Sequence, residues 1–200
     1  MVALHKASNI FVGVVHRYEL YRAIARNQEF VARIHNTNTA YAMTTIVGVL
    51  MTSLVISLTG LFDGDADSVS LKRILNTLLQ PQAVAPLERF HRSWPKNHLN
   101  THDALAGLKR IRSRLNSDRL DGAISRLRDL RNREVAHLGL QPIPADEKAK
   151  IGDIDLVYGV TANIIVSCNL IAAARKIHPR HFREVAQSQA DIFRNSIIPL

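Results

Sequence analysis

Residues 36–62 read NTNTAYAMTTIVGVLMTSLVISLTGLF and contain no charged side chain. An apolar stretch of this length can cross a lipid bilayer, or it can form the central helix of a soluble bundle, which is apolar on all sides. Small residues that could line one packing seam, Thr45, Gly48, Thr52 and Thr59, suit either setting. We expect a buried helix in a soluble protein. A membrane span, with basic residues before it and acidic residues after it, stays the alternative.

The whole chain has a globular composition and an excess of positive charge. Of its 200 residues, 46% are hydrophobic and 22% are charged, as in one folded domain. The 26 Lys and Arg against 17 Asp and Glu give a formal net charge of +9, which favours a polyanionic partner. The single cysteine excludes an intrachain disulfide and suits a reducing compartment. Because no secretory signal is recognisable either, we expect a cytoplasmic protein.

Helical periodicity extends through the rest of the chain. Apolar residues at helical spacing predict one long amphipathic helix from about Ala7 to Ile34, and a last apolar helix from Lys148 to Ile177. Prolines 81, 86 and 95 predict an irregular connection between helices. No strand pattern or repeat competes. We therefore expect a single all-α domain over residues 1–200, with its core at about 7–177 and a polar helix at 179–196.

Two sets of possible metal ligands do not develop into sites. Asp63, Asp65 and Asp67 have the spacing that begins an EF-hand loop, but Ser68 and Ile74 stand where that loop needs Gly and Glu. His178 and His181 have a spacing that zinc can use, but no second ligand pair accompanies them. We predict no metal and no cofactor.

The helix predicted from Arg119 to Leu138 ends in polar residues where apolar ones are expected. Its apolar face consists of Leu120, Ala123, Ile124, Leu127 and Leu130. At about 100° per residue, Arg131, Glu134 and His137 fall on or beside that face, whereas Arg133 points away. Such groups cost free energy when buried unless they pair or face a cleft. Glu134 can pair with Arg131 and orient His137, although a plain ion pair beside a histidine at a helix end is the simpler interpretation.

Basic residues are concentrated on this helix and on the helix before it. A solvated helical face explains most of them, but a cluster leading toward Arg131 also suits a groove that follows a phosphate backbone. The predicted RNA contacts are Arg112, Arg119, Arg126 and Arg128.

Arg131, Asn132, four further residues and then His137 resemble the motif of HEPN ribonucleases. Three longer phrases resemble the AbiU-type abortive-infection branch of that superfamily: SLTGLFDGDADSVSLKRIL, LRDLRNREVAHLG and KIGDIDLVYGV. Together the resemblance covers roughly residues 41–174.

The resemblance implies an up-and-down helical bundle that forms a homodimer, with the motifs of two protomers in one basic cleft. It also implies a metal-independent endoribonuclease that acts as a toxin or in phage defence, with an antitoxin protein as a further partner. By position, Arg131 would bind the scissile phosphate, His137 would act as general acid or base, and Asn132 would be the supporting polar residue. Glu134 is not part of the family pattern. Gly139 stands where some HEPN toxins have a tyrosine that a partner enzyme modifies, which argues against that mode of neutralisation.

Two other interpretations stay open on the sequence. In one, the chain is a catalytically inactive HEPN-type module that binds RNA or protein, and Arg131, Glu134 and His137 form a polar network at the dimer seam. In the other, it is a small membrane protein anchored by residues 40–61.

Overall fold

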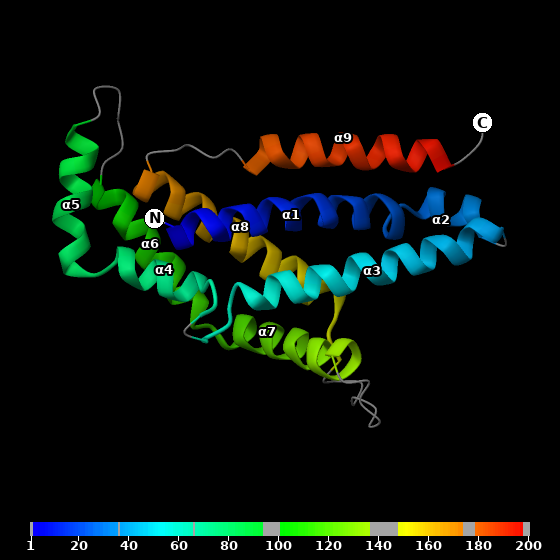
Figure 1. The fold of residues 1–200 in the computed structure, drawn as a ribbon, viewed down its shortest axis with the longest axis horizontal. Helices are drawn as coiled ribbons and strands as arrows, with labels where there is room; N and C mark the ends of the chain where they lie inside the picture. Colours follow the sequence, from blue (N-terminus) through cyan, green and yellow to red (C-terminus); the bar gives the residue numbers. More distant parts are fainter. Residues whose placement is uncertain are drawn as a thin grey trace.

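The computed structural model describes residues 2–35, 37–65, 67–93, 101–136, 148–173 and 179–197, apart from the side chains of residues 134–136, 173 and 179. Every regular element in these ranges is a helix (Figure 1). In chain order they are α1 (Val2–Ala25), α2 (Gln28–Ile34), α3 (Asn38–Gly60), α4 (Leu71–Leu78), α5 (Pro81–Arg92), α6 (Thr101–Leu115), α7 (Asp118–Leu130), the π-helical turn η1 (Arg131–Ala136), α8 (Ile151–Ala173) and α9 (Pro179–Ile197). The expected all-α class is confirmed.

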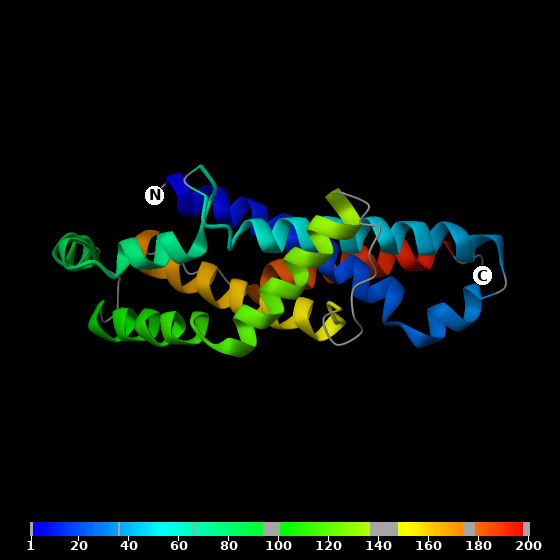
Figure 2. The same cartoon turned by 90° about the horizontal axis from the view of Figure 1, so that it is seen from below.

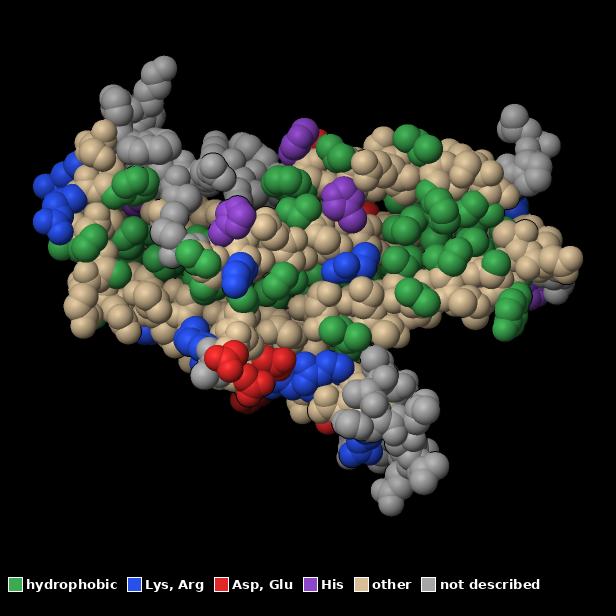
Figure 3. All heavy atoms as spheres, viewed as in Figure 1, with side chains coloured by type: hydrophobic (Ala, Val, Ile, Leu, Met, Phe, Trp, Pro, Cys, Tyr) green, Lys and Arg blue, Asp and Glu red, His purple; other side chains and the backbone are tan. Residues whose placement is uncertain are grey.

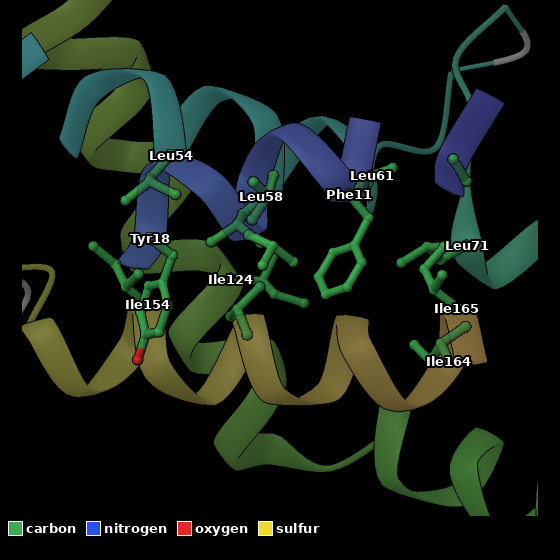
Figure 4. Packing of buried hydrophobic residues seen from close by; sticks show 14 of the residues in the cluster. Phe11, Tyr18, Leu54, Leu58, Leu61, Leu71, Ile124, Ile154, Ile164 and Ile165 are labelled. Atoms are coloured by element: carbon green, nitrogen blue, oxygen red, sulfur yellow. The ribbon is translucent and has the colours of Figure 1, made fainter. Parts of the chain in front are cut away.

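Helix α8 lies at the centre of the bundle. Helices α1, α3, α4, α6 and α7 all pack against it, and Figure 2 shows α6 alongside it and α7 crossing it. Its side chains Ile154, Ile164 and Ile165 are buried beneath α1 and α3 (Figure 4). Since each such side chain contributes about 1.5–3 kcal/mol when fully buried, α8 supplies much of the core.

Helix α3 is exposed along one face, so the expectation that its segment is the central helix is wrong. Leu50, Leu54 and Leu58 are buried on its inner face, but Tyr41 and Val49 on the outer face are 83% and 64% exposed. By length and composition alone, both α3 and α8 could span a membrane, and their apolar windows are 28% and 44% buried in the fold. The central place belongs to α8 because five helices pack against it.

The expected N-terminal helix is divided in two at Asn27. The backbone of Asn27 is extended, and its Oδ1 accepts a hydrogen bond of 2.9 Å from the backbone N–H of Phe30. An asparagine in this position satisfies a free N–H group at the start of a new helix. It therefore starts α2, and the one long helix predicted from the sequence is interrupted here.

Two of the three prolines lie inside a helix, contrary to the expected irregular connection. Pro81 is the first residue of α5, where a missing N–H costs little. Pro86 lies in the same helix and removes one of its hydrogen bonds. Pro95 lies outside the described residues.

The C-terminal helix α9 packs along α1 (Figure 1). Nε of Arg183 lies 2.7 Å from Oε1 of Glu19 on α1, and Nη1 of Arg22 lies 3.4 Å from Oε2 of the same carboxylate. Glu19 is only 2% exposed. Because a buried carboxylate needs such partners, this ion pair fixes α9 in place.

The buried thiol of Cys168 provides a test of the position of α8. Burial raises the pKa of Cys168 to about 12, and its side chain is inaccessible to solvent. Since the thiolate is the reactive form, the native protein at pH 8 should react very slowly with Ellman's reagent. The protein unfolded in guanidinium should show one reactive thiol per chain. Rapid reaction of the native protein would contradict the central place of α8.

Candidate functional site

Arg131 lies where α7 changes into η1. The α-helix predicted to Leu138 is wrong over Arg131–Ala136, which form a π-helical turn. Residues 137 and 138 lie outside the described residues. In such a turn each N–H bonds to the fifth residue before it, so the following side chains leave the axis at different angles from those of an α-helix. Single π turns next to α-helices are frequent at functional sites.

The Arg131 side chain points toward the end of α3, in agreement with its predicted inward orientation. It is 25% exposed, and its Nη1 donates to Oδ2 of Asp63 at 3.0 Å and to Oγ1 of Thr59 at 3.3 Å. Its Nε donates to Oδ1 of Asn132 at 3.1 Å. Asn132 and Arg133 are exposed. The guanidinium is thus held against α3 while its neighbours face solvent.

Thr59 is held in place by contacts that do not involve Arg131. Its side chain is fully buried, and its hydroxyl donates to the carbonyl of Val55 at 2.7 Å. The hydroxyl oxygen therefore keeps a lone pair available for Arg131.

The other half of the predicted motif cannot be placed. His137 lies outside the described residues, and so does the side chain of Glu134. The pairing of Glu134 with Arg131 and the orientation of His137 stay predictions. What the structure brings together is Arg131 and Asn132 with Asp63 and Thr59, from segments about seventy positions apart in the chain.

Asp63 is the residue of this site that sequence reasoning missed. The sequence suggested Asp63 as the first ligand of a calcium loop and as one of the acidic residues flanking a possible membrane span, but not as a partner of Arg131. Its Oδ1 also lies 3.5 Å from Nε of Arg128, whose Nη2 donates to the carbonyl of Phe62 at 2.7 Å. No periodicity connects Asp63 with α7. The one hint in the sequence is an acidic cluster at the end of a charge-free helix.

Of the four arginines predicted to bind RNA, two have structural partners. Arg126 forms two hydrogen bonds with Asp153, from Nη2 to Oδ1 at 2.6 Å and from Nε to Oδ2 at 3.0 Å. Arg128 holds the end of α3, as described above. Arg112 and Arg119 are exposed. These two are better placed to meet a polyanion, whereas Arg126 and Arg128 stabilise the fold.

Acidic and basic side chains meet along the edge of the molecule below α3 (Figure 3). Neither of two surface pockets is lined by Arg131. One, of about 210 Å³ between α1 and α9, is lined by Arg22, Arg26 and Arg194, which pair with Glu19, Asp155 and Asp191. The other, of about 330 Å³, lies beside α4. Within the described parts of the chain, no group of three or more His, Cys, Asp or Glu side chains is placed to bind a metal ion.

Comparison with known protein families gives a match over nearly the whole chain. The family model HEPN_AbiU2, described as AbiU2, matches residues 3–193. This range includes Asp63, Arg131 and all the helices except the ends of α1 and α9. No curated protein and no solved structure matches the chain.

The Arg126–Asp153 pair should make stability depend on pH. The hydrogen bonds from Arg126 lower the pKa of Asp153, which also accepts a hydrogen bond of 2.8 Å from the backbone N–H of Lys150 and so caps α8. A lowered carboxyl pKa stabilises the fold above the ordinary value of 3.8, and this contribution disappears as the pH falls through the lower folded value. We expect Asp153→Asn to reduce the free energy of unfolding at pH 7 by roughly 1–3 kcal/mol and to weaken its acid dependence.

Urea unfolding between pH 2 and pH 7 measures both effects. Arg126→Gln should behave similarly, whereas the exposed control Arg119→Gln should stay within about 0.5 kcal/mol of the wild type. Equal acid dependence in the wild type and Asp153→Asn would show that this pair does not stabilise α8.

Proposed function

Because the chain belongs to the AbiU2 family of HEPN proteins, we propose that it is a metal-independent endoribonuclease, acting as a toxin or in phage defence. The family is related to abortive infection. RNA is the proposed substrate, and the excess of 26 basic over 17 acidic residues supports a polyanionic partner.

The proposed reaction uses a nucleophile that RNA itself carries. A base removes the proton of the 2′-hydroxyl, the 2′-oxygen attacks the neighbouring phosphorus, and an acid protonates the departing 5′-oxygen. The products end in a 2′,3′-cyclic phosphate and a 5′-hydroxyl. The protein therefore has to supply a proton carrier and a cation that stabilises charge on the phosphate. In this proposal His137 carries the proton and Arg131 is the cation.

The observation that carries the proposal is the fixed position of Arg131 in the π turn. Its Nη1 and Nε are engaged by Asp63, Thr59 and Asn132. Among the contacts of the described residues, Nη2 has no such bond, so this amino group remains to donate to a phosphate oxygen. A guanidinium held in advance loses little freedom when the substrate binds, which is what stabilisation of a transition state requires.

The same contacts favour a second candidate function. The pairing of the Arg131 guanidinium with Asp63 and Thr59 is also what a purely structural link between α3 and η1 would require. In that case the chain would be a catalytically inactive module that binds RNA or a partner protein.

Cleavage assays in EDTA distinguish these two functions. The wild type should cut RNA without a metal, leave 2′,3′-cyclic phosphate ends, and spare DNA of the same sequence, which lacks the attacking hydroxyl. His137→Ala should abolish cleavage because the proton carrier is lost. Arg131→Ala should do the same and weaken RNA binding, whereas Arg133→Ala, an exposed neighbour, should retain nearly full turnover. Cleavage by pure His137→Ala protein would refute this mechanism.

We also propose that the protein forms a homodimer in the cytoplasm. The mass of the particle in solution and its solubility without detergent test this proposal. Light scattering of protein purified without detergent should give twice the chain mass of 22.4 kDa. The exposed apolar face of α3 would then be partly covered by protein. A monomer over a wide concentration range would contradict the dimer. Recovery in the membrane fraction would favour the membrane-anchored alternative.

A further inference from the structure

We propose that Asp63 is a positioning residue of the ribonuclease, which holds Arg131 at the junction of α3 and η1 in the orientation that meets the scissile phosphate. This inference rests on the proposed function. It concerns a residue outside the motif, contributed by a different part of the chain.

Asp63 is itself held firmly enough to position another side chain. Its backbone N–H donates to the carbonyl of Gly60 at 3.3 Å, and its carbonyl accepts from the hydroxyl of Ser68 at 3.2 Å. The preceding residues are also fixed, because the carbonyl of Leu61 accepts from the N–H of Leu71 at 2.9 Å. The Asp63 side chain is 23% exposed. It therefore presents its carboxylate from a defined turn between α3 and α4.

The carboxylate holds Arg131 at one edge only. Oδ2 of Asp63 contacts Nη1 at 3.0 Å, and Thr59 contacts the same Nη1. A carboxylate in the two-bond fork geometry would occupy a whole edge of the guanidinium and compete with phosphate. Here the contact restricts the side chain and leaves Nη2 unoccupied by any described residue. This contact geometry orients the Arg131 side chain and does not block its Nη2 from a phosphate.

The charge of the group also remains suitable for an anion. Asp63 lies between two guanidinium groups, Arg131 at 3.0 Å and Arg128 at 3.5 Å. One carboxylate against two cations leaves these three residues with a net positive charge. Their net positive charge favours a phosphate, and the exposed Asp65 and Asp67 of the same loop oppose it.

Arg128 already provides the structural connection at this place. It joins α7 to the turn that follows α3, through the carbonyl of Phe62 at 2.7 Å. Arg131 adds a second link a few residues away. The Asp63–Arg131 contact is therefore not needed as the sole polar link between these segments, and its direct effect is to restrict the Arg131 side chain.

The decisive variant is Asp63→Asn, which keeps the shape of the side chain and removes its charge. We expect kcat to fall about 10- to 100-fold, as a misplaced catalytic group typically causes. The Kd for a non-cleavable RNA with 2′-deoxy substitution should stay within about threefold or decrease, because removal of a negative charge favours RNA binding. Asp63→Glu should restore part of kcat. The control Asp67→Asn, an exposed residue of the same loop with the same change of charge, should leave kcat unchanged and affect Kd no more than Asp63→Asn does.

A second measurement does not depend on catalysis. The Nε–Hε resonance of Arg131, assigned by its loss in Arg131→Lys, should show a rigid side chain in the wild type and a mobile one in Asp63→Asn. If kcat and this mobility are the same in the wild type and Asp63→Asn, the inference is wrong even when the wild type is a ribonuclease. If Arg131 becomes mobile but the wild type cuts no RNA, the contact is real and the proposed function is wrong. A fall in kcat that matches the loss of folded protein, measured by circular dichroism, would assign Asp63 a structural role and also overturn the inference.

Discussion

The burial of α8 is the constraint on which the rest of the structure depends. This helix carries Ile154, Val157, Ile164 and other apolar side chains around its axis, and each must be removed from water. Five helices supply the cover. With that many helices around one axis, α3 and α9 can reach the core on one side only, which is why α3 retains an exposed face.

Two carboxylates at the start of α8 determine which helices stand beside it there. Asp153 pairs with Arg126 of α7. Asp155 accepts a hydrogen bond of 2.7 Å from the hydroxyl of Tyr18 on α1 and lies 2.7 Å from Nη2 of Arg26, the residue that follows α1. Burial, and then the hydrogen bond to Asp155, raise the pKa of Tyr18. Because residues two apart point to nearly opposite sides of a helix, these carboxylates connect α8 with α7 on one side and with α1 on the other.

The candidate site follows from this arrangement. Once α7 is fixed against α8 through Arg126, its C-terminal end lies beside the last turn of α3, and η1 contacts α3 directly. Arg128 and Arg131 then find their partners in residues 59–63. The arginines of α7 and η1 thus have different tasks although they lie close together in the chain. Arg126 and Arg128 connect helices, and Arg131 is held by similar contacts, but no described residue bonds to its Nη2.

The sequence by itself determined the helical class, the inward orientation of Arg131 and the family resemblance, because local periodicity and a contiguous motif need no knowledge of distant residues. Prediction from the sequence was wrong where the outcome depends on contacts between residues far apart in the chain. Residues 36–62 were expected to form the central helix, but α8 occupies the centre. The helical periodicity continues through Asn27, although a new helix starts there. The motif segment forms a π turn where an α-helix was expected. Only the tertiary structure could pair Asp63 with Arg131, because an ion pair between residues 68 positions apart depends on how α3 and α7 pack and leaves no periodic trace in the chain.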